Sequence, residues 1–318
     1  MPIQQSTSAI LRLVENIETV IVGKRPAVQL CVATLLSGGH MLIEDIPGVG
    51  KTMLARALAK SVGGVFKRIQ FTPDLLPADI TGVSIYDQQA RRFEFRPGPI
   101  FANLVLADEI NRATPKSQAA LLEAMEEFQV TADGETRSLP EPFFVVATEN
   151  PIEYEGTYSL PEAQLDRFMS RVSLGYPSHD DEVDVLTRQM VVHPIERVES
   201  VLTPQDVLDL RRTVRGTHVE DSLKDYIVTI ASETRRHPDV ELGASPRGSI
   251  ALVRMSQAVA AIDGRDYIVP DDVKYVAIPT LAHRTVIKPD RRIQGVTSDQ
   301  VVDEILATVK VPIGEGIG

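Results

Sequence analysis

The chain has 318 residues, 43% hydrophobic and 24% charged, which is an ordinary composition for a globular protein with room for two domains. Its formal net charge of −11 argues against nucleic-acid binding, which needs a basic surface. Cys31 is the only cysteine, so an intramolecular disulfide and a thiolate metal site are excluded, and we expect a reducing cytoplasm. The sequence contains no apolar run of about eighteen residues, so no membrane span is predicted. We also expect no signal peptide.

The first 60 residues predict two helices, a strand and a third helix. Apolar residues recur at helical spacing over residues 8–20, and a second helix is expected over residues 26–36. A strand over residues 40–44 leads into a glycine-containing loop and then a helix from Lys51 to Lys60. This order of strand, loop and helix is what a phosphate-binding loop requires.

The loop at residues 45–52 predicts a triphosphate site. Gly48 and Gly50 allow tight curvature and close approach of backbone N–H groups, and the helix that follows adds its positive N-terminal end. Lys51 can reach the β- and γ-phosphates, and the Thr52 hydroxyl can ligate Mg²⁺. Asp45 stands where the usual pattern has its first glycine. The predicted nucleotide-contacting residues of the loop are Pro47, Gly48, Val49, Gly50, Lys51, Thr52 and Met53.

A strand and a hairpin are predicted after the loop helix. Residues 66–71 have the pattern of a strand, and residues 72–77 that of an extended connection rich in turn residues. Apolar residues alternate on both sides of the polar centre at residues 87–90, which predicts a β-hairpin over residues 83–95.

The apolar run at residues 104–107 ends in Asp108 and Glu109, as in a buried parallel strand with carboxylates at its C-terminal edge. Ligands of open α/β sheets bind at that edge. Asp108 could therefore hold Mg²⁺ through water, and Glu109 could orient and deprotonate the water that attacks the γ-phosphate. The alternative is a solvated strand end, which the upstream phosphate loop disfavours.

A helix that begins after Thr114 is predicted over residues 115–128, because threonine is a good N-cap and proline suits the first helical position. A second hairpin is predicted over residues 130–137, where an Asp-Gly pair lies between strand-like residues. The glutamates of the helix are interpreted as a solvated face: Glu123, Glu126 and Glu127.

The strand predicted over residues 143–148 leads into Glu149, Asn150 and Pro151. Pro151 cannot continue a strand, which leaves Asn150 at the sheet edge. Its amide can donate and accept hydrogen bonds at the γ-phosphate or at the attacking water. An asparagine before proline is also a common turn former, and taken alone the pattern favours that interpretation.

Two arginines follow, Arg167 and Arg171, which share one face if their segment is helical. Surface arginines are ordinarily salt-bridge partners. In an oligomeric ATPase, however, one of them could reach a neighbour's γ-phosphate, an effect worth about 10³ to 10⁵ in rate.

Residues 175–178 are the predicted domain boundary, and capped helices with apolar stripes suited to a small bundle follow it. Arg247 stands in the first turn of one of these helices, where a cation opposes the helix dipole by about 0.3–1 kcal/mol. We hypothesise that it contacts nucleotide phosphates, in its own subunit or across an interface. The predicted stripes are Val183, Leu186 and Met190, then Ile227 and Ile230, then Ile305, Leu306 and Val309.

Six blocks, in order, resemble the MoxR family of AAA+ ATPases and cover most of residues 39–176. The resemblance implies an α/β fold with a P-loop AAA+ core at residues 1–176, whose central, mainly parallel sheet is flanked by helices, and a C-terminal all-α lid domain at residues 177–318. Beyond the core the match is chiefly Ser245-Pro246-Arg247. The blocks are PGVGKT at 47–52, QFTPDLLP at 70–77, DEINR at 108–112, LLEAMEE at 121–127, ATENP at 147–151 and LDRF at 165–168.

The resemblance also implies residue roles. The hairpin at 83–95 would be the helix-2 insert of this AAA+ clade, and the hairpin at 130–137 would precede sensor 1. The implied roles are sensor 1 for Asn150, sensor 2 for Arg247, arginine finger for Arg167 with Arg171 as the alternative, and a place beside the adenine for Val22 and Gly23.

Family members are thought to be hexamers with ATP bound between subunits, and chaperones that mature or activate partner proteins, often ones with a von Willebrand factor A domain. We therefore expect a Mg²⁺-dependent ATPase that remodels a protein client. Three alternatives remain: a nucleic-acid-stimulated AAA+ motor, a small-molecule P-loop kinase, and a regulatory nucleotide-binding module without turnover. Glu109 disfavours the last, because an inactive switch need not keep a candidate base.

Overall fold

A five-stranded sheet with the strand order β2-β5-β8-β1-β9 lies at the centre of the N-terminal part, and all its neighbouring strands are parallel. The structure is a computed structural model that describes residues 3–151, 157–190 and 193–312. The expected central parallel sheet is confirmed. Its strands are β1 (Met41–Glu44), β2 (Phe66–Gln70), β5 (Leu104–Asp108), β8 (Phe144–Glu149) and β9 (Ser170–Val172).

The three inner strands, β5, β8 and β1, are buried on both faces, which explains why they read as apolar runs. Met41 and Ile43 of β1 point into one hydrophobic cluster, and Leu42 points into the other. Helices α1 (Ile3–Glu18), α2 (Arg25–Ser37) and α3 (Lys51–Ser61) contribute to the first cluster. Helices α4 (Pro77–Thr81) and α5 (Pro115–Glu127) contribute to the second.

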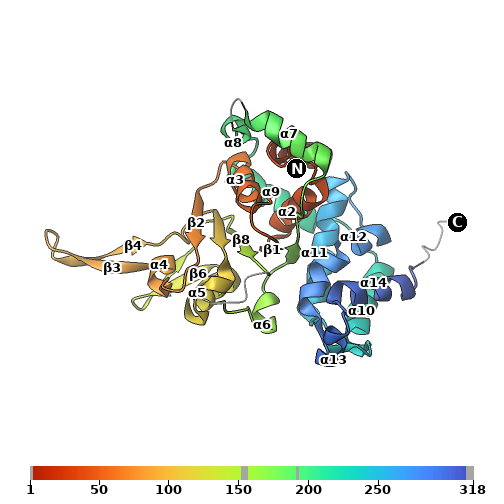
Figure 1. Cartoon of the computed structure of the whole chain (residues 1–318). Coiled ribbons are helices and arrows are strands. Elements are labelled where there is room, and N and C mark those ends of the chain that lie inside the picture. The colour runs from red at the N-terminus through yellow and green to blue at the C-terminus, as the bar shows by residue number, and fades with distance from the viewer. Residues whose placement is uncertain (1–2, 152–156, 191–192, 313–318) are drawn as a thin grey trace.

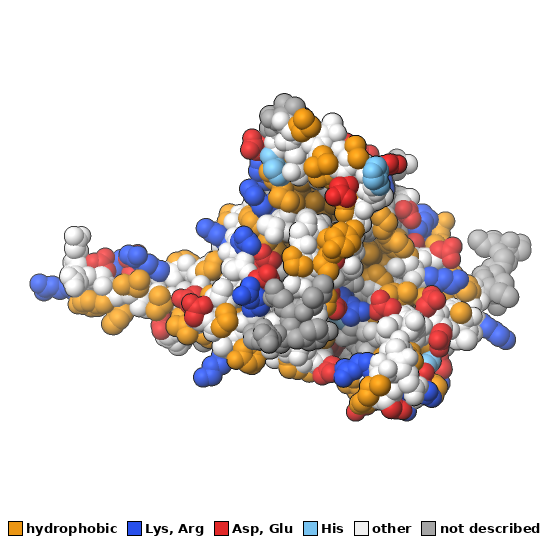
Figure 2. Space-filling view, in the orientation of Figure 1, with side chains coloured by type: hydrophobic (Ala, Val, Ile, Leu, Met, Phe, Trp, Pro, Cys, Tyr) orange, Lys and Arg blue, Asp and Glu red, His pale blue; other side chains and the backbone are white. Residues whose placement is uncertain are grey.

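Both predicted hairpins are present. Strands β3 (Gly82–Asp87) and β4 (Arg92–Pro97) form a long antiparallel hairpin that projects from the body of the molecule (Figure 1). Strands β6 (Gln129–Ala132) and β7 (Glu135–Ser138) form the shorter one. Hydrophobic side chains line one edge of the long hairpin (Figure 2). The exposed large hydrophobic residues on it are Val83, Ile85, Tyr86 and Phe93.

The C-terminal half is mainly helical. The helices between residues 221 and 308 lie on the side of the molecule away from the long hairpin, whereas those between residues 179 and 215 lie near α2 and α3 (Figure 1). The prediction of capped helices is confirmed, because the side chains of Ser178, Thr203 and Thr297 each accept a hydrogen bond from the first turn of the helix that follows. Its helices are α7 (His179–Gln189), α8 (Pro194–Arg197), α9 (Pro204–Arg215), α10 (Asp221–Arg236), α11 (Pro246–Ile262), α12 (Pro270–Leu281), α13 (Pro289–Ile293) and α14 (Ser298–Thr308). The remaining elements are α6 (Glu162–Leu165), the 3₁₀ turns η1 (Ile110–Arg112) and η2 (Ala282–Arg284), and the strands β10 (Val240–Leu242) and β11 (Val286–Ile287).

The apolar stripe of α7 does not pack into a bundle, contrary to the prediction. Val183, Leu186 and Met190 are 50%, 62% and 84% exposed. Helical periodicity reveals an apolar face but not whether anything in the same chain covers it, so the prediction failed here. The stripes of α10 and α14 are confirmed at Ile227, Ile230 and Ile305, all at most 3% exposed. Within the described residues, no helix has both the length and the apolar character needed to cross a bilayer.

Candidate functional site

The phosphate loop joins the end of β1 to α3. Gly48 and Gly50 have φ of +86° and +96°, backbone conformations that glycine adopts without strain. The loop borders a cavity of about 310 Å³, into which the ends of β5 and β8 also deliver side chains. The structure therefore brings the loop together with three polar residues predicted from separate strands. The cavity is lined by Pro47, Gly48, Gly50, Lys51, Thr52, Met53, Asp108, Glu109 and Asn150.

Lys51 lies in the first turn of α3, and main-chain oxygens hold its ammonium group. Nζ donates to the carbonyl oxygens of Asp45 at 2.5 Å and Glu149 at 3.1 Å. Burial lowers the pKa of Lys51, and the surrounding carboxylates oppose that shift only in part. Neutral carbonyl partners leave the charge of the lysine available for a phosphate.

Asp108 ends β5 with only 8% of its surface exposed. One carboxylate oxygen accepts from the Thr148 hydroxyl at 2.6 Å, and the other accepts from Arg68 Nε at 3.0 Å. The hydroxyl of Thr52 lines the same cavity. A hydroxyl and a carboxylate are hard oxygen ligands, so this donor set fits Mg²⁺ bound together with phosphates and water.

Glu109 adopts the left-handed conformation, with φ of 57° and ψ of 52°, which costs a non-glycine residue about 1–3 kcal/mol. Its N–H donates to the Thr148 hydroxyl at 2.9 Å. One oxygen of its carboxylate accepts from Gln70 Nε2 at 2.7 Å and from Arg112 Nη1 at 2.9 Å. No sequence pattern singled out Gln70, Arg112 or Thr148 as site residues, and together they fix the backbone and side chain of the candidate base.

Asn150 follows β8 directly and is only 4% exposed. It lines the phosphate-loop cavity together with Lys51 and Glu109. Its main-chain oxygen accepts a hydrogen bond from Asn111 Nδ2 at 3.4 Å, which ties the end of β8 to the turn after β5. A turn-forming role and a place in the site are thus both compatible with its position.

Asp45, the residue that departs from the usual loop pattern, has a structural task. Its carboxylate accepts from the backbone N–H groups of Ile46 at 2.8 Å, Leu174 at 2.6 Å and Gly175 at 2.7 Å, and from the Ser173 hydroxyl at 3.0 Å. Burial acts to raise the pKa of this carboxyl, but the hydrogen bonds outweigh burial and hold the pKa below its usual value. Asp45 therefore ties the start of the phosphate loop to the segment that leaves β9.

Val22 and Gly23 lie near the loop but do not line its cavity. Gly23 has φ of +70°, and a Cβ there would meet the Asp181 carboxylate at the start of α7. The side chain of Ile21, just before them, lies 4.0 Å from the position that a Cβ on Gly50 would occupy. Val49 is likewise absent from the cavity lining and packs partly buried against the first hydrophobic cluster.

Arg167 and Arg247 lie together in a different place. Both line a second cavity of about 280 Å³, which shares no lining residue with the phosphate-loop cavity. Glu126 joins them: Arg167 Nη2 lies 3.1 Å from Oε2, and Arg247 Nη2 lies 2.5 Å from Oε1. Glu126 lies on the exposed helix face predicted for it, and it makes two ion pairs there that were not predicted. Spacing along a helix cannot reveal a partner that comes from residues 41 and 121 positions away.

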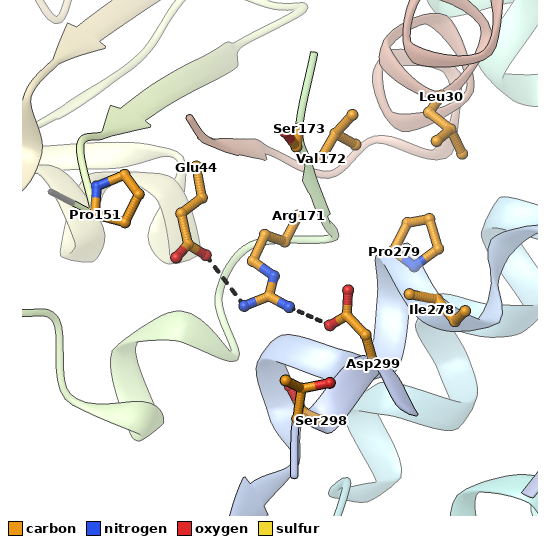
Figure 3. A pocket seen from close by; sticks show the side chains of 11 residues that line it. Leu30, Glu44, Pro151, Arg171, Val172, Ser173, Ile278, Pro279, Ser298 and Asp299 are labelled. Carbon is orange, nitrogen blue, oxygen red and sulfur yellow. Dashed lines mark hydrogen bonds and ion pairs between the residues drawn. The ribbon is translucent and has the colours of Figure 1, made fainter. Parts of the chain in front are cut away.

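Arg171 lies apart from Arg167, because the segment that carries them is not helical. Helix α6 ends at Leu165, and Arg171 belongs to β9. Its guanidinium lies 3.1 Å from a carboxylate oxygen of Glu44 and 2.6 Å from one of Asp299 (Figure 3). It borders a third cavity, of about 560 Å³, between β1, β9, α12 and the start of α14. Two carboxylates of its own chain thus engage Arg171.

Two protein-family models together match most of the chain. A family model described as "ATPase family associated with various cellular activities (AAA)" matches residues 40–170, and a model of the AAA lid domain matches residues 232–305. The first range spans the sheet, both hairpins and the phosphate-loop cavity. The second spans α11, α12 and α13 with most of α14.

Individual proteins match over nearly the whole chain. The chain is 57% identical to the YeaC protein of Bacillus subtilis, over 95% of this chain and 94% of the relative. It is 41% identical to "Chaperone MoxR1" of Mycobacterium tuberculosis, over 95% of this chain and 82% of the relative. A crystal structure of a candidate ATPase from Cytophaga hutchinsonii superposes with a TM-score of 0.91 at 37% identity, covering 98% of this chain and 97% of that one.

Proposed function

The chain belongs to the MoxR family of AAA+ ATPases, and we propose that it is a Mg²⁺-dependent ATPase that works as an oligomer and remodels, matures or activates a partner protein. The observation that carries this proposal is one cavity that collects Lys51, Thr52, Asp108, Glu109 and Asn150 from two separate strand ends and a helix start. The cytoplasm is the proposed compartment, because a lone buried cysteine suits a reducing environment.

The side chains of the cavity divide the reaction between them. Lys51 binds the β- and γ-phosphates, and Thr52 and Asp108 hold the metal ion. Bound Mg²⁺ would neutralise charge that develops on the phosphates. Glu109 orients and deprotonates the attacking water, and Asn150 aligns it. Gln70 and Arg112 both donate to one carboxylate oxygen of Glu109, so in this proposal the other oxygen accepts the proton of the attacking water.

In this proposal, a neighbouring copy of the chain supplies the arginine side chains that complete the site. In the described residues, the lining of the phosphate-loop cavity includes no arginine, whereas Arg167 and Arg247 line a separate cavity. Such an arrangement suits a site shared between subunits, with Arg167 as the arginine finger and Arg247 as sensor 2. Arg171 is the weaker candidate because Glu44 and Asp299 already engage it. A division into a core at residues 1–176 and a lid at residues 177–318, assembled as a hexamer, completes the proposal.

The client is a protein in this proposal, since a relative at 41% identity is named a chaperone. A protein with a von Willebrand factor A domain is the class that the family resemblance suggests. The exposed apolar edge of the β3–β4 hairpin offers a surface for such a contact. The acidic net charge of −11 disfavours the alternative of a nucleic-acid motor.

Two inactive variants, mixed together, test the shared site. Glu109→Gln should bind ATP and hydrolyse it about 10²- to 10⁴-fold more slowly, because the general base is lost. Arg167→Ala should bind ATP and hydrolyse it about 10³- to 10⁵-fold more slowly. Arg171→Ala is the matched arginine control, with a smaller effect expected.

In a mixture, an intact Glu109 from the Arg167→Ala chain can meet an intact Arg167 from the Glu109→Gln chain. The mixture should therefore recover activity that neither variant has alone, and steady-state phosphate release measures it. Full activity of pure Glu109→Gln would refute the assignment of the base. Failure of the mixture to recover, with co-assembly verified, would place Arg167 outside the neighbour's site.

A further inference from the structure

We propose that Glu126 is a positioning residue that holds Arg167 and Arg247 as one unit for the triphosphate bound by the neighbouring copy. This inference rests on the proposed function, in which those arginines act across the interface. It assigns a role to a carboxylate that the sequence pattern placed on a solvated helix face.

The two arginines come from different parts of the chain. Arg167 follows the short helix α6 of the core, whereas Arg247 is in the first turn of α11 in the helical half. Each oxygen of the Glu126 carboxylate engages one guanidinium, at 3.1 Å and 2.5 Å. A guanidinium has five N–H donors, so one bond to Glu126 leaves donors on both arginines for a phosphate.

The helix dipoles do not account for the positions of Glu126 and Arg247. Glu126 lies in the last turn of α5, where the helix dipole disfavours an anion, and Arg247 lies in the first turn of α11, where it disfavours a cation. Each residue occupies the wrong end of its own helix. The Glu126–Arg247 pair compensates both, so the nearby anion that the position of Arg247 calls for is present within the chain.

A second network, made of hydrogen bonds around Asp166, fixes the main chain next to both arginines. The Asp166 carboxylate accepts from Arg284 Nε at 2.7 Å and from the Ser245 hydroxyl at 3.2 Å. Ser245 Oγ in turn accepts the N–H of Arg247 at 3.2 Å and so caps α11. The main chain at Arg167 and at Arg247 is thus held by Asp166, which leaves the long side chains as the mobile parts. Glu126 orders those side chains.

The solvent exposure of the three side chains argues for a positioning role of Glu126 and against a stabilising one. The side chains of Glu126, Arg167 and Arg247 are 32%, 28% and 55% exposed. Ion pairs with this much solvent contact add little to folding stability, because water screens them and side-chain entropy opposes them. Loss of Glu126 should therefore leave the fold unchanged while releasing both guanidinium groups. Misplacement of a reacting or charge-stabilising group by about 1 Å can lower a rate about 10²-fold.

Glu126→Gln tests the bridge with almost no change in shape or helix propensity. The amide oxygen can accept from one arginine, but the amide NH₂ then faces the other guanidinium, so only half of the bridge can form. We expect kcat to fall about 10²-fold, with the affinity for a fluorescent ATP analogue and the melting temperature unchanged. Glu123→Gln, an exposed position on the same helix, is the matched control and should retain wild-type kcat.

Mixing distinguishes this role from damage to the chain's own phosphate loop. A mixture of Glu126→Gln with Glu109→Gln should recover activity, because the second chain carries an intact arginine pair. A mixture of Glu126→Gln with Arg167→Ala should not recover, because both chains carry the same defect. Wild-type kcat in Glu126→Gln, or recovery in the wrong mixture, would overturn the inference.

The same experiments separate this failure from failure of the proposed function. If Glu109→Gln and Arg167→Ala complement each other while Glu126→Gln is fully active, only the role of Glu126 is wrong. If Glu109→Gln and Arg167→Ala fail to complement each other, the shared site itself is wrong, and the positioning role falls with it.

Discussion

The carboxyl groups of Asp45 and Glu149, beside the phosphate loop, show how the surroundings of a group set its pKa. Asp45 accepts hydrogen bonds from four donors, and its pKa lies below the usual value. Burial raises the pKa of Glu149 to about 7, the neighbouring Glu44 adds to the shift, and Arg171 and Lys51 oppose it. One carboxylate is therefore firmly ionised, whereas the other changes charge near neutral pH.

Glu149→Gln should be stabilising at pH 8 and lose that advantage near pH 4.5. The folded-state pKa of about 7 exceeds the ordinary glutamate value of 4.5, so the native protein keeps a proton that the unfolded chain releases. This group therefore lowers stability as pH rises from 4.5 to 7 and has no further effect above 7. The variant should gain about 1–3 kcal/mol at pH 8, measured by urea unfolding. A pH-independent difference, like that expected for the exposed control Glu123→Gln, would contradict the shifted pKa.

The residues of the phosphate site could be predicted where they are adjacent in sequence and not where strand order brings them together. Lys51 and Thr52 follow the loop glycines, and Asp108 and Glu109 follow an apolar run, so local pattern was enough. Gln70 reaches Glu109 because β2 pairs with β5 in a register that places Gln70 opposite Asp108. A parallel sheet leaves no signal of strand order in the sequence itself.

The helices and strands themselves were predicted more reliably than the contacts between them. The two hairpins were expected as separate units, but the structure packs them together. Arg137 of β7 lies over the ring of Phe95 in β4, with Cζ 3.9 Å from the centroid. The N–H of Ser84 donates to the Asp133 carboxylate at 3.2 Å. The shorter hairpin ends at Ser138 and β8 begins at Phe144, so the long hairpin contacts the segment that leads into the start of β8.

Arg137→Ala should loosen the long hairpin without unfolding the protein. A cation–π contact is worth about 0.5–2 kcal/mol, so amide hydrogen exchange over residues 82–97 should accelerate about 2- to 30-fold. Hydrogen-exchange mass spectrometry measures this, and the melting temperature should change little because the contact lies at the surface. Arg91→Ala at the exposed hairpin tip is the control. Equal exchange in the two variants would show that the hairpins move independently.

At the scale of the whole molecule, Arg284 joins the helical half to the sheet domain. Its side chain is only 4% exposed, and it donates to the main-chain oxygens of Phe168 at 2.6 Å and Met169 at 3.3 Å. It also donates to the Asp166 carboxylate and to the Thr280 carbonyl oxygen of the preceding helix α12. Nothing in the sequence singled out Arg284, because an arginine that caps carbonyl groups of a distant segment has no local signature.

Arg284→Met should destabilise the whole chain. The change leaves the Asp166 carboxylate and several buried carbonyl groups without their main donor, and removal of one partner of a buried ion pair costs about 3–5 kcal/mol. Urea unfolding measures the loss, and Arg292→Met at an exposed position of α13 should be neutral. A loss no larger than that of Arg292→Met would mean that the two halves hold together through apolar packing alone.

The hydrogen bonds of Asp45 have a consequence for redesign. A procedure that scored the loop by its likeness to other phosphate loops would replace Asp45 with glycine and count the change as an improvement. That replacement would remove the acceptor of three backbone N–H groups and one hydroxyl, and would detach the nucleotide-facing loop from the strand exit at residues 173–175. Asp45 thus connects the loop to the rest of the chain through its hydrogen bonds, and the glycine of the common pattern would remove that connection.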